Sequence, residues 1–150
     1  GEAPAKECPQ CQALVHAVSP LRPDHARLIL EIARQARIPR LVLLSTSDEL
    51  PGLPPGHLTR AREAEEAACG GGDAPPVCVV LRTGLVWGPR RSIPEACDRL
   101  LSASSPPPAI APERVERVGM AALRAALEPE HHGVLEPDQI AHLGDAMMIQ

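Results

Sequence analysis

The fold is decided by Val77-Cys78-Val79-Val80-Leu81-Arg82-Thr83-Gly84-Leu85-Val86-Trp87-Gly88-Pro89. The first five residues of this stretch are apolar and include three valines, a pattern typical of a buried strand. Gly84 and Gly88 follow the strand, and glycine allows a backbone to turn tightly and to approach a ligand closely. We therefore predict a buried strand that runs into a tight loop.

Strands and helices alternate on both sides of this stretch. Before it, the pattern predicts a strand at 13–18, a helix at 24–37, a strand at 41–44 and a helix at 58–69. After it, the pattern predicts a short helix from about 94 to 103, a Ser/Pro-rich run at 104–108, a helix at 113–127 and a strand at 133–136. This order, with nearly continuous apolar strands, predicts an α/β domain with a mainly parallel sheet of about four strands. We expect an irregular start over 1–10, one domain over 11–140 and a tail over 141–150.

The composition excludes several classes of function. The chain has 150 residues, 44% of them hydrophobic, and a formal net charge of -4, which is typical of one globular domain. Neither that charge nor the single aromatic residue, Trp87, offers a surface for nucleic acid. No apolar run reaches the roughly 20 residues of a membrane span, which leaves peripheral attachment to a membrane complex open. Five cysteines, an odd number, favour reduced thiols and an intracellular, reducing compartment.

Two pairs of residues are of types that bind metals. Cys8 and Cys11 are separated by two residues, as in zinc sites, but no second pair stands at a matching distance. The alternative for Cys11 is a small apolar residue at the entry to the first strand. His131 and His132 are interpreted as part of a solvated turn.

The stretch that decides the fold resembles the strand that ends in Leu-Arg-Pro-Gly-x-Val-Tyr-Gly-Pro in the extended or atypical short-chain dehydrogenases/reductases. Thr83 and Trp87 stand where that family has Pro and Tyr. Residues 11–16 are similar to the family's Cys-Asp-x-Val-Ile-His strand, and residues 40–47 to its Arg-Phe-Val-Tyr-Val-Ser-Ser strand. The resemblance covers roughly residues 11–140 and is closest to the family's carboxyl-terminal half. It extends to the NAD(P)H-binding accessory subunit of respiratory complex I, and it implies an incomplete Rossmann-like, three-layer fold.

Two parts of the family pattern are missing. No Gly-x-x-Gly-x-x-Gly loop precedes Cys11, so the first βαβ unit, which binds the cofactor pyrophosphate, is absent or lies on another polypeptide. The catalytic Tyr-x-x-x-Lys aligns with His57 and Ala61, or with Leu58 and Arg62 one residue further on. We therefore expect no bound cofactor, and NADPH or NADH only if the missing half is supplied.

The resemblance also suggests site residues. Ser47 aligns with the substrate-polarising Ser and His57 with the Tyr, so these two are the catalytic candidates. The candidates for the cofactor side are Ser19, Pro20, Ser45, Arg82, Thr83, Gly84 and Val86. For Ser47, the alternative is a turn or cap residue. The carboxylates of Glu63, Glu65 and Glu66 are interpreted as the solvated face of a helix.

Three functions are consistent with these patterns. The first is a catalytically degenerate Rossmann-like subunit with a structural or interaction role in a larger protein assembly, in an organellar matrix or stroma, or alternatively in the cytoplasm. The exposed edge of its first strand would require a protein partner. The second is the carboxyl-terminal part of an NAD(P)-dependent reductase or epimerase whose cofactor-binding half lies elsewhere. The third is a small regulatory binding module.

Overall fold

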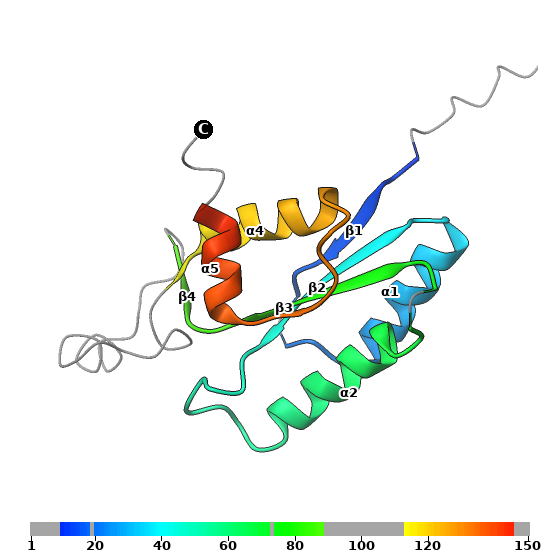
Figure 1. Cartoon of the computed structure of the whole chain (residues 1–150). Coiled ribbons are helices and arrows are strands. Elements are labelled where there is room, and N and C mark those ends of the chain that lie inside the picture. The colour runs from blue at the N-terminus through cyan, green and yellow to red at the C-terminus, as the bar shows by residue number, and fades with distance from the viewer. Residues whose placement is uncertain (1–9, 19, 73, 89–112, 146–150) are drawn as a thin grey trace, which may run out of the picture.

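The computed structural model describes residues 10–18, 20–72, 74–88 and 113–145 (Figure 1). Within them, a four-stranded parallel sheet has the order β1 (Ala13–His16), β2 (Arg40–Thr46), β3 (Val77–Thr83) and β6 (Gly133–Leu135). This α/β, Rossmann-like arrangement confirms the fold class that the sequence predicts. The predicted helix near 94–103 and the Ser/Pro-rich run lie outside the described residues.

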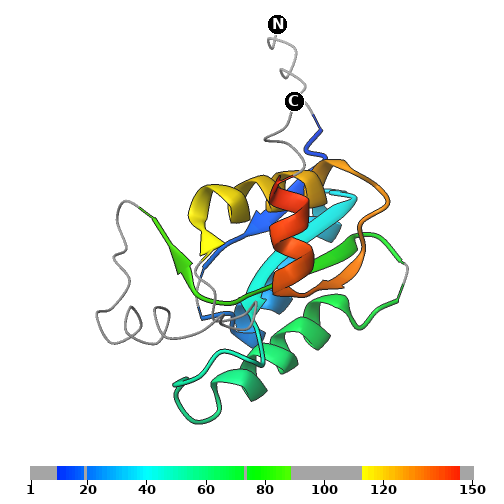
Figure 2. The same cartoon turned by 60° about the vertical axis from the view of Figure 1, so that its left-hand side comes forward.

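Helices cover both faces of the sheet. The helices α1 (Pro23–Gln35) and α2 (His57–Cys69) lie on one face, and α4 (Val115–Leu127) and α5 (Pro137–Asp145) lie on the other (Figures 1 and 2). Alternate residues of β2 pack on opposite faces of the sheet. Leu41 and Leu43 belong to the core beneath α1 and α2, and Val42 belongs to the core beneath α4 and α5. Because both faces are covered, each central strand contains an unbroken apolar run, Leu41–Leu44 in β2 and Val77–Leu81 in β3.

Three elements were not predicted. The residues after 140 were expected to form a tail, but α5 runs to Asp145 and buries Ile140 and Leu143 against α4 and the sheet. The stretch Val86–Trp87, expected in a loop, forms β4 and pairs in parallel with β5 (Glu113–Arg114). These two residues of β5 were expected to begin the helix at 113–127, which instead begins at Val115. The loop after β3 is therefore fixed by a second, two-stranded sheet.

The cysteines differ from the expectation of reduced thiols. Cys69, at the end of α2, and Cys78, in β3, form a disulfide. The expectation is therefore wrong for this pair, because the turn between α2 and β3 brings the two side chains together. Cys11 is free and exposed, and Cys8 lies outside the described residues.

No helix in the described part of the chain combines the length and the apolar character that crossing a membrane requires.

Candidate functional site

Polar side chains gather where β2 and β3 end. Ser45 and Thr46 close β2, Ser47 follows it, and Arg82 and Thr83 close β3. In open α/β sheets, ligands bind outside the carboxyl ends of the strands. This edge is therefore the place to look for a functional site.

A buried carboxylate, Glu65 of α2, lies at the centre of this edge with only 6% of its surface exposed. Ser45 Oγ donates a hydrogen bond of 2.6 Å to Glu65 Oε1. Arg82 Nη2 donates to Glu65 Oε2 at 2.8 Å, and Arg62 forms an ion pair with the same carboxylate. A buried charge needs such partners, because removing it from water is costly. We call Ser45, Arg62, Glu65 and Arg82 the Glu65 network.

Arg82 extends this network across the sheet. Its Nη1 lies 3.0 Å from Glu136 Oε1, just after β6. Hydrogen bonding to Glu65, and more weakly to Glu136, raises the pKa of Arg82. Next to it, Thr83 Oγ1 donates a hydrogen bond of 3.1 Å to the backbone oxygen of Ser45. Arg82 therefore joins α2, β3 and the start of α5.

Arg62 fixes the loop that follows β2. Its guanidinium donates to the backbone oxygen of Thr46 at 2.8 Å and forms an ion pair with Asp48. The hydrogen bond from Arg62 lowers the pKa of the Asp48 carboxyl. The guanidinium of Arg62 thus contacts Glu65, Asp48 and Thr46 at once, and it is engaged with the protein itself.

The two catalytic candidates lie in different settings. Ser47 is 1% exposed, its Oγ accepts a hydrogen bond from the Glu49 N–H at 3.3 Å, and its own N–H donates to Thr83 O at 2.9 Å. The first is the bond of a turn residue, and the second continues the pairing of β2 with β3. His57, the first residue of α2, has its Nε2 3.2 Å from Thr46 Oγ1. The structure therefore pairs the candidate His57 with Thr46.

The remaining candidates are spread along the same edge. Pro20 is exposed after β1, Gly84 follows β3, and Val86 pairs with Glu113 and packs on the core beneath α4. Ser19 lies outside the described residues. The glycine at position 88 has a packing reason, because a side chain there would overlap Val115 of α4.

The sequence interpretation of one carboxylate is wrong. Glu63 and Glu66 are exposed as expected, but Glu65 is buried. The signal that could have found it is its spacing, since Glu65 falls in the series of buried residues Ala61, Ala64, Glu65 and Ala68. Residues at such spacings share one face of a helix, and here that face packs on the sheet.

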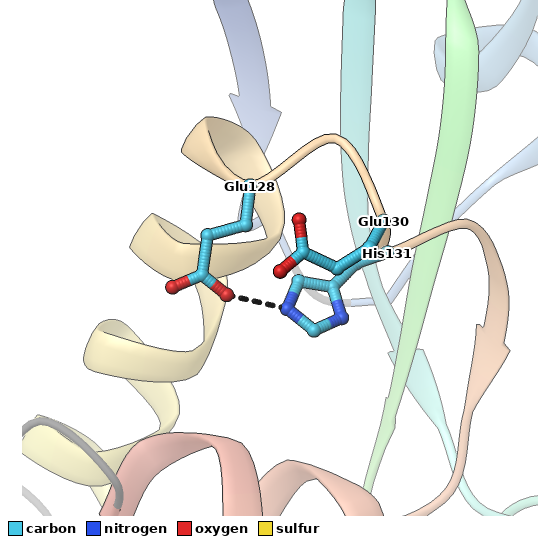
Figure 3. Close-up of side chains that lie close together, drawn as sticks. All are labelled: Glu128, Glu130 and His131. Atoms are coloured by element: carbon cyan, nitrogen blue, oxygen red, sulfur yellow. Dashed lines mark hydrogen bonds and ion pairs between the residues drawn. The ribbon is translucent and has the colours of Figure 1, made fainter.

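A second polar cluster lies at the opposite end of the strands, between α4 and β6 (Figure 3). Glu128, Glu130 and His131 each place one potential metal-ligand atom within 4.8 Å of the others. Glu128 Oε2 lies 2.6 Å from His131 Nε2, and Arg124 Nε donates to Glu128 Oε1 at 2.7 Å. Arg124 first, and then His131, hold the pKa of Glu128 below its ordinary value. Arg124 and His131 thus engage the carboxylate of Glu128 at the end of α4, and His131 lies at the end of a turn, as predicted.

His16 at the end of β1 leads to a prediction about pH. Its Nδ1 is buried without a hydrogen-bond partner among the described residues, and its ring centroid lies 6.4 Å from that of His25. Burial first, and His25 second, lower the pKa of His16 from its ordinary value of 6.5. The unfolded chain therefore binds a proton before the folded protein does, and stability falls as the pH drops below 6.5 toward the folded pKa.

The variant His16→Gln should remove the contribution of His16 to the pH dependence of the free energy of unfolding. The loss of stability between pH 7 and pH 5 should then be shallower. Urea unfolding at several pH values measures it. The exposed His132→Gln is the control and should keep the slope of the wild type. An unchanged slope in His16→Gln would contradict the assignment.

Comparisons with known proteins bear on the fold. No protein-family model matches the sequence, and no curated protein matches it. A solved structure described as MoeE5 in complex with UDP-glucose and NAD is similar, with a TM-score of 0.56 and 18% sequence identity. The match covers 91% of this chain and 62% of the MoeE5 chain, so this chain spans less than two thirds of MoeE5. At this identity the likeness supports a Rossmann-like fold.

Proposed function

We propose that this chain is a catalytically inactive Rossmann-like subunit, or part of one, with a structural role in a larger protein assembly. The observation that carries the proposal is the closed Glu65 network. Its charged groups lie at the edge where such folds bind ligands, yet they bind one another. The edge is therefore built to hold the sheet, α2 and the following loop together.

The positions that align with the catalytic pair support the same conclusion. Ala61 is 2% exposed and supplies no amine that could hold a cofactor ribose or lower the pKa of an acid. In the alternative alignment, Arg62 supplies a cation, but Glu65 and Asp48 neutralise it. Neither alignment provides both a proton donor and a free cation.

The exposed edge of the sheet supports an interaction role. Among the described strands, β1 lies at the outer edge of the sheet, next to β2. Val15, in β1, is 44% exposed, and Val18, two residues after β1, is 55% exposed. The outer backbone groups of an edge strand are able to pair with another chain. A protein partner that covers β1 therefore fits the proposed role, with an organellar matrix or stroma as the proposed location.

The test uses the protein in its native assembly. Calorimetric titration with NADH and with NADPH should show no saturable binding. Val15→Lys should release the protein from its assembly, because it places a charge at the covered edge, and native size-exclusion chromatography would detect the smaller species. Leu28→Lys, on the exposed face of α1, is the matched control and should leave the assembly intact.

A second candidate function, part of an NAD-dependent reductase or epimerase, is favoured by the contact between His57 and Thr46. A His held by a hydroxyl at this edge is placed to accept or donate a proton. The complex of MoeE5 with NAD agrees with this candidate at the level of the fold. Micromolar binding of NADH that His57→Ala or Thr46→Ala weakens would establish it and overturn the inactive scaffold.

A further inference from the structure

We propose that the amino-terminal edge of the sheet carries a binding site for a small organic anion, recognised by Arg34 and Arg37. A pocket of about 240 Å³ lies there, between the end of α1, the residues before β2 and the residues before β3. It is at the opposite end of the strands from the Glu65 network. The site is therefore independent of the proposed function, and each can fail without the other.

The charge of the pocket is the first argument. Among the described residues, its lining contains two arginines and no carboxylate. Within the described ranges, neither guanidinium has a hydrogen bond or an ion pair, whereas those of Arg62, Arg82 and Arg124 are all ion-paired. Two unneutralised cations at one pocket, in a chain with a net charge of -4, favour an anionic ligand.

The backbone of Arg37 is the second argument. Its φ is +53°, in the left-handed region, directly after the C-cap of α1 at Ala36. Helices that end in this way usually have glycine at this position, because a side chain makes the conformation less favourable. Such conformations in other residues cluster at functional sites. A binding role for the guanidinium explains why an arginine stands here.

The backbone that carries Arg37 is held by hydrogen bonds, and Arg34 lies next to a second turn. Arg37 N donates to Arg34 O at 3.1 Å and Ile38 N to Ala33 O at 2.8 Å, so the turn that carries Arg37 is fully hydrogen-bonded. Arg34 extends toward the turn between α2 and β3, where a Cβ added to Gly71 would lie 3.7 Å from Arg34 Nη2. Both arginines belong to the lining of the pocket, and Arg34 lies on the side of the turn between α2 and β3.

The floor of the pocket defines the rest of the ligand. It is apolar, formed by Ile38 and Pro39 before β2 and by Pro75 and Pro76 before β3, with Ile38 and Pro76 buried. Guanidinium groups bind phosphate and carboxylate through paired, charge-assisted hydrogen bonds. A volume of about 240 Å³ is smaller than that of pockets for drug-sized ligands. The ligand class is a phosphate or carboxylate group attached to an apolar body about the size of one ring.

The test is a titration with phenyl phosphate, benzoate and inorganic phosphate, followed by NMR of the backbone amides and by calorimetry. Phenyl phosphate or benzoate should saturate the site, shift the amides of Ile38 and Gly71, and bind more tightly than inorganic phosphate. The tighter of the two identifies the anionic group. Arg34→Gln should weaken binding by about tenfold or more, the effect of losing one hydrogen bond between charged groups.

Arg37→Gly separates binding from folding. It removes the guanidinium and relieves the left-handed conformation, so binding should fall by about tenfold or more while the thermal midpoint stays equal or rises. Arg27→Gln and Arg60→Gln, which remove exposed cations outside the pocket, are the controls and should bind as the wild type does. The proposal is overturned if neither organic anion saturates, if the controls weaken binding as much as Arg34→Gln, or if Arg37→Gly binds normally.

Discussion

Glu65→Ala should destabilise the protein by about 3–5 kcal/mol, the range found when one partner of a buried ion pair is removed. The variant leaves Ser45 without its hydrogen-bond acceptor and removes the buried partner of Arg62 and Arg82. Arg62 would keep its ion pair with Asp48, and Arg82 its ion pair with Glu136. These two carboxylates are 64% and 45% exposed, so they would offset little of the lost stability. Equilibrium unfolding in urea measures the loss.

The same helix offers a matched control. Glu63 is exposed on α2, so Glu63→Ala should change stability by less than about 0.5 kcal/mol. Glu65→Gln keeps the shape and an acceptor for Ser45 but loses the charge, and it should fall between the two. If Glu65→Ala proved as mild as Glu63→Ala, the carboxylate would not be the centre of the network, and the main support for an inactive scaffold would be removed.

The strands and helices that the sequence predicted share one property. In β2 and β3 both faces are buried, so runs of Leu and Val identify the strand without knowledge of the rest of the fold. In α1, apolar residues recur at spacings of three and four. For these elements, the local pattern and the final packing agree.

The elements and contacts that were missed depend on distant residues. The helix α5 has only two large buried side chains, Ile140 and Leu143, and its place is set by contacts with α4, such as Arg124 donating to the Leu143 oxygen at 3.1 Å. Glu65 was interpreted as a surface charge because its partner Arg82 is 17 residues further along the chain. Local charge patterns do not show which carboxylate a later strand will bury.

The sequence predicted the location of the candidate site better than it predicted the contacts within the site. The ends of β2 and β3 do meet at one edge, as a parallel sheet requires, and Ser45, Arg82 and Thr83 lie together there. The partner of His57 is set by the course of the loop between β2 and α2, which contains two glycines with positive φ, Gly52 and Gly56. The conformation of such a loop is not encoded in a hydrophobic pattern.

Leu81→Ala should cost about 2–5 kcal/mol, with the result in the upper half of that range. Leu81 is fully buried in β3, opposite Leu44 on one side and Leu135 on the other. Above it, four of the five buried residues of α4 are alanines, and alanine has no side-chain rotamers that could refill the space. The cavity should therefore persist, and the cost of a deleted side chain rises with the cavity that remains.

Urea unfolding of Leu81→Ala, compared with that of Leu127→Ala, tests this account of the core. Leu127 lies on α4 but is 58% exposed, so its truncation should cost less than about 1 kcal/mol. Because the chain contains no Phe or Tyr, its core depends on many aliphatic contacts of similar size, and the loss of one leucine removes a full share of them. A cost for Leu81→Ala close to that for Leu127→Ala would mean that α4 moves onto the sheet to fill the gap, and that the layer is less rigid than its packing indicates.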